Sequence, residues 1–163
     1  MLIARIQSAV LIIFVLPAFF GCSRSPHTYS IYTVTINNPA GNIVMISFSE
    51  VPHAAACGVT AKAADKGIAE ANPEAGTSGR AAVCVSELPP DLQRVAGGER
   101  LPGAYIVKIL WPPASPTYSI TRGFPIDRPD AICRSLTERM KEHLHANDAT
   151  ITCQYPLEVA STP

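Results

Sequence analysis

Alternating apolar and polar residues mark two neighbouring segments of the chain, 29–37 and 43–49. The apolar residues that share a face are Tyr32, Val34 and Ile36 in the first segment and Val44, Ile46 and Phe48 in the second. A period of two predicts strands with one face against a core. The linker 38–42, Asn-Pro-Ala-Gly-Asn, consists of turn-forming residues. The pattern therefore predicts a hairpin.

Further strand signals come from four segments, which are 81–86, 104–111, 117–122 and 149–155. Segment 104–111 is apolar except for Lys108, so we expect a central strand that is buried on most of both faces. Tyr118 and Ile120 share one face of the next segment, which predicts a partner strand beside it.

A helical period appears in segment 128–146. Its apolar stripe repeats every four residues, through Ile132, Leu136, Met140 and Leu144. Asp127 precedes the stripe and Pro129 lies in its first turn, and both residue types favour a helix start. The pattern predicts an amphipathic helix that packs one face on a sheet.

Segment 53–71 is a weaker helical candidate. Alanine and lysine favour a helix there, whereas Gly58 and Gly67 each weaken it by roughly 1 kcal/mol. Segment 72–79 is rich in Gly, Pro and Ser and predicts a loop. Together the elements predict one α+β domain over 29–157, with an antiparallel or mixed sheet of five to six strands. Residues 158–163 form a C-terminal tail.

The first 21 residues have the anatomy of a secretory signal peptide. Arg5 is followed by an apolar run from Ser8 to Phe20. A run of about 13 residues rises only ~20 Å as a helix, which is short of the ~30 Å core of a bilayer. A charged start, a short apolar run and a small-residue exit indicate export.

The exit, Phe19-Phe20-Gly21-Cys22-Ser23, resembles the lipobox of bacterial lipoproteins. Gly21 and Cys22 fit that pattern, and Phe19 and Phe20 depart from it. The resemblance implies lipidation of Cys22, a tether over 22–28, and attachment in the cell envelope. Ser23 after the Cys favours the outer membrane, facing the periplasm. Cleavage after Ser23 to give a soluble periplasmic protein, and an uncleaved anchor, are the alternatives.

Five cysteines support export independently of the lipobox. With Cys22 set aside, an even set of four remains. An even set in an exported domain predicts two disulfides. After Cys133 the predicted helix rises ~20 Å and the next strand returns ~14 Å to Cys153. The first-choice pairing is therefore Cys133–Cys153, which leaves Cys57–Cys84.

Charge and motifs narrow the function. Lys plus Arg number 13 and Asp plus Glu number 13, with no basic run, so nucleic acid is not expected as the main partner. His143 and His145 lie about 200° apart on a helix, which disfavours a shared metal ion. The acidic pairs Glu87 with Asp91 and Glu138 with Glu142 are expected on solvated surfaces. No G-x-S-x-G motif is present, and no cofactor, metal or catalytic residue is predicted.

Trp111 and Tyr118, on either side of a proline-rich turn, are the candidate interaction surface. The leading hypothesis is a non-enzymatic envelope lipoprotein that binds another protein or an envelope component, in an accessory, inhibitor or immunity role. The alternative is a periplasmic carrier or sensor of a small ligand, and a hydrolase is third. An exposed apolar or aromatic patch near Trp111 and Tyr118 would favour the first hypothesis, and a deep, apolar, largely closed cavity would favour the second.

Overall fold

The computed structural model describes residues 27–37, 41–71, 76–144 and 148–157. The predicted signal peptide, Cys22, most of the tether and the 158–163 tail lie outside these ranges, as does His145. The elements in chain order are β1 (Thr28–Ile36), β2 (Ile43–Val51), α1 (Ala54–Ala71), β3 (Thr77–Val85), α2 (Pro90–Ala96), β4 (Ala104–Leu110), β5 (Thr117–Arg122), α3 (Pro129–Leu144) and β6 (Thr150–Gln154).

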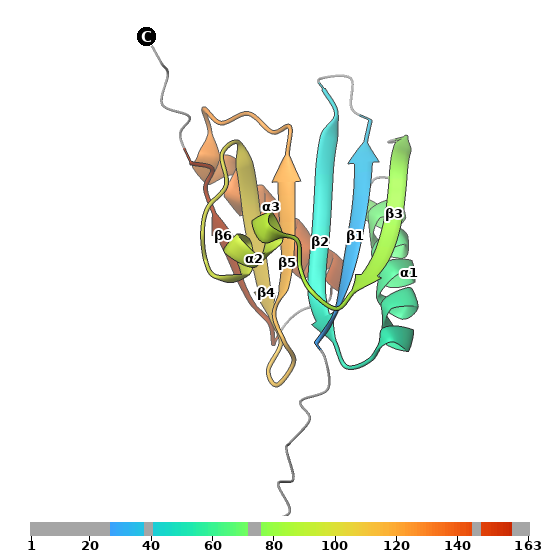
Figure 1. Cartoon of the computed structure of the whole chain (residues 1–163). Coiled ribbons are helices and arrows are strands. Elements are labelled where there is room, and N and C mark those ends of the chain that lie inside the picture. The colour runs from blue at the N-terminus through green and yellow to red at the C-terminus, as the bar shows by residue number, and fades with distance from the viewer. Residues whose placement is uncertain (1–26, 38–40, 72–75, 145–147, 158–163) are drawn as a thin grey trace, which may run out of the picture.

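A single six-stranded sheet has the order β3-β1-β2-β5-β4-β6, and every neighbouring pair is antiparallel (Figure 1). The predicted class, an α+β domain with disulfides, is confirmed. The first hairpin pairs in register from Thr28 opposite Val51 to Ile36 opposite Ile43. The strand predicted over 104–111 is an interior strand, between β5 and the edge strand β6, and most of its residues are buried.

The two halves of the sheet repeat one arrangement. In the first half a hairpin, β1 and β2, is followed by α1 and then by β3, which pairs with β1. In the second half a hairpin, β4 and β5, is followed by α3 and then by β6, which pairs with β4. The strand orders β3-β1-β2 and β6-β4-β5 meet where β2 pairs with β5. The fold is thus a ββαβ unit repeated around a pseudo-two-fold axis between these two central strands.

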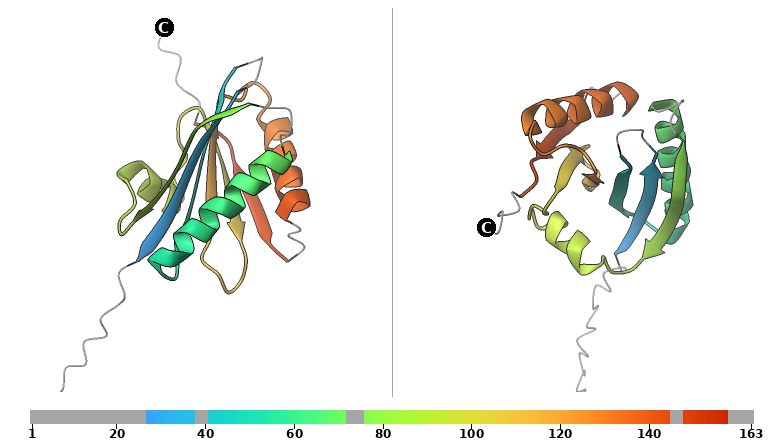
Figure 2. Two further views of the ribbon diagram at one scale, coloured as in Figure 1. Left: turned by 90° about the vertical axis from the view of Figure 1, so that its right-hand side faces the viewer. Right: turned by 90° about the horizontal axis from the view of Figure 1, so that it is seen from above.

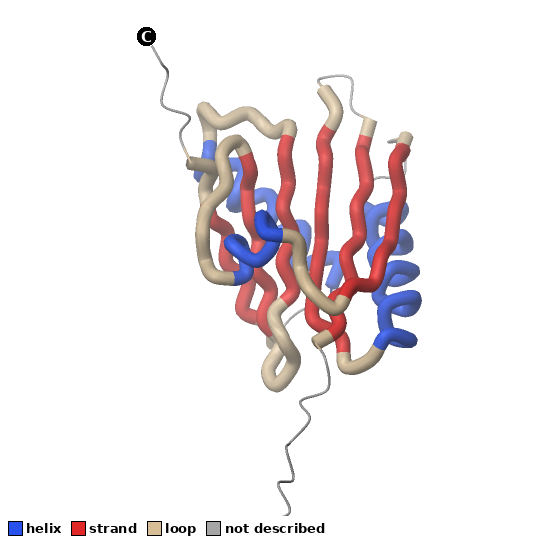
Figure 3. Tube along the Cα trace, viewed as in Figure 1, coloured by secondary structure: helices blue, strands red, loops and turns tan. Residues whose placement is uncertain are grey.

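The helices are divided between the two faces of the sheet. Figures 1 and 2 show α1 and α3 on one face and α2 on the other. The tube in Figure 3 shows the same division, with the short α2 in front of the strands and the longer helices behind them. We call the first face the α1/α3 face and the second the α2 face.

The larger core lies on the α2 face. Leu92 and Val95 of α2 pack there against Phe48, Ile106 and Ile120 of the sheet. The predicted face of Val44, Ile46 and Phe48 points to this side, whereas Tyr32 and Val34 point to the α1/α3 face, because Val34 lies opposite Met45 in the register. Helices therefore lie on both faces of the sheet, and Phe48, Ile106 and Ile120 are buried on the α2 face.

Two disulfides join each long helix to the outer strand of its own half. Cys57 of α1 is bonded to Cys84 of β3, with a Cα–Cα distance of 6.1 Å. Cys133 of α3 is bonded to Cys153 of β6, with a Cα–Cα distance of 5.6 Å. These are the two predicted pairs. Each bridge fixes one helix against the edge of the sheet.

The prediction of a loop over 72–79 is wrong for its last three residues, because β3 begins at Thr77. This part of the strand pairs with β1 across a register shift between Thr33 and Thr35. Gly79 has a positive φ of 60° at this irregularity, a backbone conformation that glycine adopts without a steric cost. Tertiary pairing with β1 therefore overrides the local turn composition.

Candidate functional site

A groove runs over the α1/α3 face of the sheet, between the two helices. Its volume is about 570 Å³. One wall comes from α1, through Thr60, Ala63 and Ala64, and the other comes from α3. Ala63 is exposed at the rim, so the groove is open to solvent. We expected a ligand carrier to have a largely closed cavity, and the structure has an open groove instead.

The packing of α3, which forms the second wall, differs from the predicted helix packing. The apolar stripe was expected to pack on the sheet, yet Ile132, Leu136 and Met140 are only half-buried and line the groove. Among the residues of α3 whose burial is described, only Cys133 is fully buried, and its disulfide holds it against β6. The stripe therefore gives the groove a largely apolar wall, which Ser135 and Arg139 also line.

The floor of the groove carries small hydroxyl side chains. They are Ser30 of β1, Ser47 and Ser49 of β2, and Thr117, Ser119 and Thr121 of β5. The Ser47 and Ser119 hydroxyls are 3.3 Å apart, across the central strand pair. These side chains are too small to fill the space between the helices, which leaves the groove open along the pseudo-two-fold axis.

Thr121 of this floor has a buried hydroxyl whose hydrogen-bonding capacity is unsatisfied. Its residue is 3% exposed, and its hydroxyl oxygen has no hydrogen-bond partner within the described part of the chain. A buried hydroxyl without a partner costs about 1–3 kcal/mol. The floor thus includes a hydroxyl group that does not serve to hold the domain together.

Strand register gives the groove two different ends. Ser30, Ser49 and Thr117 lie in one row across the sheet, and the strand before Trp111 ends on the same side. Ile36 and Ile43 face each other at the opposite end. We call these the hydroxyl end and the apolar end. Phe124 also lines the groove and packs edge-on against Tyr105, whose hydroxyl donates to the Pro125 carbonyl at 2.6 Å.

The course of α3 places Arg139 toward the hydroxyl end. The helix begins beside Tyr155, whose hydroxyl donates to Asp130, and it passes Cys153 at Cys133. The helix therefore runs toward Thr150. This residue lies opposite Leu110, the residue that precedes Trp111 in the sequence. Arg139 is exposed and is the only charged residue among the described residues that line the groove.

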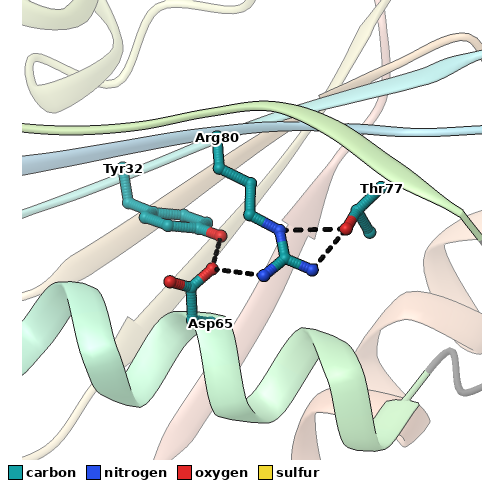
Figure 4. Close-up of polar contacts among 4 residues, drawn as sticks. All are labelled: Tyr32, Asp65, Thr77 and Arg80. Carbon is teal, nitrogen blue, oxygen red and sulfur yellow. Dashed lines mark hydrogen bonds and ion pairs between the residues drawn. The ribbon is translucent and has the colours of Figure 1, made fainter.

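A polar cluster holds the α1 wall in place (Figure 4). The Tyr32 hydroxyl donates to Asp65 of α1, and the Arg80 guanidinium of β3 lies 3.5 Å from the same carboxylate. Arg80 Nε also donates to Thr77 at 2.9 Å. Burial, followed by the hydrogen bond and charge of Asp65, raises the pKa of Tyr32 to about 12. The tyrosine therefore stays neutral at physiological pH and acts as a donor that links β1 to α1.

Trp111 and Tyr118 do not form one surface. Trp111 is half-buried and lines the groove. Tyr118 is 8% exposed on the α2 face, where its ring stacks on Phe48 at 5.0 Å and its hydroxyl donates to the Ala96 carbonyl at 3.3 Å. Lys108 covers the same ring, 5.8 Å from its centre. The sheet separates the two aromatic residues, because Tyr118 points to one face and Trp111 reaches the other.

The predicted acidic pairs lie on the surface. Glu87, Asp91, Glu138 and Glu142 are all exposed. Asp91 pairs with Arg94 at 2.8 Å, and Glu87 accepts a hydrogen bond from Gln93 at 3.2 Å. No group of three or more His, Cys, Asp or Glu side chains in the described ranges is placed to hold a metal ion.

The comparisons with known proteins give no relative. No protein family, curated protein or solved structure matches the chain. Among the helices that the structure describes, none is long and apolar enough to cross a membrane.

The groove was not predicted from the sequence, but a signal for it exists. In β2 and β5 one face carries large apolar residues, and the other carries a run of small hydroxyl residues, at Ser47, Ser49, Thr117, Ser119 and Thr121. In a sheet covered on one side only, such residues would face water. What the pattern does not reveal is that two helices cover this face and leave its centre open.

Proposed function

We propose that this chain is a non-enzymatic binding protein of the bacterial cell envelope, whose ligand occupies the groove between α1 and α3. The observation that carries the proposal is the groove itself, with apolar walls above a hydroxyl floor. Small-molecule sites commonly have volumes of ~300–1,000 Å³ and combine apolar walls with a few placed polar groups. The groove, at about 570 Å³, has that size and that composition.

The geometry favours the carrier or sensor hypothesis over binding of a protein at the predicted aromatic surface. That surface required Trp111 and Tyr118 side by side, and the sheet separates them. Trp111 instead lines the groove. Its low-entropy aromatic side chain is suited to contact an apolar ligand there.

Attachment to the envelope forms the other half of the proposal. Lipidation at Cys22 would leave a tether of a few residues before β1, which begins at Thr28. The two disulfides support an oxidising compartment, because such bonds persist in exported proteins. The ligand-binding domain would then lie close to the membrane surface, facing the periplasm.

The chain has one tryptophan, Trp111, so its fluorescence reports on the groove. The test is a titration of the purified protein with the uncharged dye N-phenyl-1-naphthylamine, with energy transfer from Trp111 as the signal. We expect saturable transfer. The variant Ala63→Phe, which places a ring at the rim of the groove, should weaken dye binding at least tenfold, about the effect of ~1.4 kcal/mol.

The matched control is Ala55→Phe, the same substitution at an exposed position of α1 that does not line the groove. It should bind the dye as the parent does, and circular dichroism should show that both variants are folded. Binding that does not saturate, or that is equally strong in Ala63→Phe and the parent, would contradict the proposal.

A further inference from the structure

We propose that the ligand is a single-chain amphiphile with a carboxylate head, a long-chain fatty acid, and that Arg139 recognises the carboxylate. This inference rests on the proposed function and names the class of ligand for the same groove. It is carried by three observations, which are the charge of the lining, the order of polar and apolar residues along the groove, and its volume.

Arg139 is the only charged residue among the described residues of the lining. This guanidinium has no hydrogen bond or ion pair in the described part of the chain, although it follows Glu138 directly. Arg94, by contrast, is paired with Asp91 at 2.8 Å. An arginine fork matches the two oxygens of a carboxylate. The described residues of the lining therefore complement an anionic group and include no carboxylate for a cationic one.

The order of residues along the groove matches an amphiphile. Arg139 lies toward the hydroxyl end, with Ser49 and Thr117. The other end is formed by Ile36 and Ile43 on the sheet, with Phe124 in the loop after β5. A head group held by Arg139 and the hydroxyls would direct its chain along the stripe of α3 toward the apolar end.

The volume of the groove matches a ligand with one acyl chain better than a ligand with two. A methylene group occupies roughly the ~30 Å³ share of a water molecule in the liquid. About 570 Å³ therefore accommodates one chain of about 16 carbons with its head group, and a second chain of that length would extend out of the groove into solvent. The groove thus favours a free fatty acid over a diacyl phospholipid.

The test compares hexadecanoic acid with hexadecan-1-ol as competitors of N-phenyl-1-naphthylamine on the purified protein. At pH 8 the acid is ionised, because carboxyl groups titrate near ~4.3. We expect the acid to compete about tenfold more strongly than the alcohol, the fold-change of roughly one charge-assisted hydrogen bond. Arg139→Gln should remove this preference without changing competition by the alcohol, and Arg139→Lys should retain part of it.

The control variant is Arg134→Gln, on the same helix at an exposed position outside the groove lining, which should keep the full preference for the acid. Equal competition by acid and alcohol in the parent, or an unchanged preference in Arg139→Gln, would overturn the carboxylate inference and leave the proposed groove function standing. Stronger competition by dioleoyl phosphatidylglycerol vesicles than by the acid would overturn the single-chain inference. Failure of the dye itself to bind would refute the proposed function.

Discussion

Tyr32 shows how one buried side chain supports the groove. It lines the floor, and its hydroxyl donates to Asp65 on the α1 wall. Arg80 from the outer strand reaches the same carboxylate, so a single carboxylate connects three elements. Asp65 is not one of the residues that line the groove, and its carboxylate is paired with Arg80, so the cluster positions α1 without placing an unpaired negative charge beside an anionic ligand.

The Tyr32 hydrogen bond should make stability depend on pH in the alkaline range. The pKa of Tyr32 is raised from 10.0 to about 12 in the folded protein. Its contribution is therefore complete below pH 10 and is lost as the pH rises through about 12, because the unfolded state loses the proton first. Tyr32→Phe should cost about 1 kcal/mol in the free energy of unfolding at pH 8.

Urea unfolding between pH 8 and 11 measures this effect. The difference in stability between the parent and Tyr32→Phe should narrow above pH 10. Tyr29→Phe, which removes a phenol whose hydroxyl has no hydrogen bond within the described part of the chain, is the control for a general effect of losing a phenol. A difference that stays constant across this range would contradict the role given to Tyr32.

At the scale of elements, each groove wall is a helix fixed to an edge strand by one disulfide. The sequence separations are 27 for Cys57–Cys84 and 20 for Cys133–Cys153. The α1 wall is also tied to the sheet by the Tyr32 cluster. The apolar stripe of α3 is only half-buried, so this wall depends more strongly on its bridge.

Removing either bridge should lower the free energy of unfolding by about 3 kcal/mol, because each closes a loop of this length in the unfolded chain. The variants are Cys57→Ala with Cys84→Ala, and Cys133→Ala with Cys153→Ala, compared by urea unfolding. The second variant should also weaken binding of N-phenyl-1-naphthylamine more than the first. Equal effects of the two variants on dye binding would contradict the dependence of the α3 wall on its disulfide.

For the whole molecule, the position of the groove follows from the repeated ββαβ unit. The halves meet at the β2–β5 pair, and each carries its helix on the same face. The disulfides lie within the halves and do not cross the junction. The spacing of α1 and α3 is therefore set by the central strand pair and by the contact between the two helices.

Attachment of this molecule to the envelope is tested at Cys22. When expressed in a bacterial host with radiolabelled palmitate, the parent should incorporate label and fractionate with membranes. Cys22→Ala should incorporate no label, and no mature form of it should fractionate with membranes. Ser25→Ala, just outside the motif that resembles a lipobox, should behave as the parent does. A Cys22→Ala protein that is processed and membrane-bound like the parent would contradict lipid anchoring.

Much of the fold could be predicted from local patterns. Period-two alternation identified β1 and β2, the four-residue stripe identified α3, and the lengths of the predicted helix and strand indicated Cys133–Cys153. These features depend on neighbours in sequence or on a single crossover. The beginning of β3 at Thr77 was not predicted, because its pairing with β1 joins residues that are distant in the chain.

The sequence by itself determined the class of fold, most of its strands and its two long helices, and it indicated the disulfide pairs, because periodicity and chain reach are local properties. Only the tertiary structure decided which faces the helices cover, and that decision created the groove. It placed Trp111 and Tyr118 on opposite sides of the sheet and brought Arg139 beside the hydroxyl floor. The physical reason is that strand order and helix spacing arise from non-local packing, which alternation within one strand does not encode.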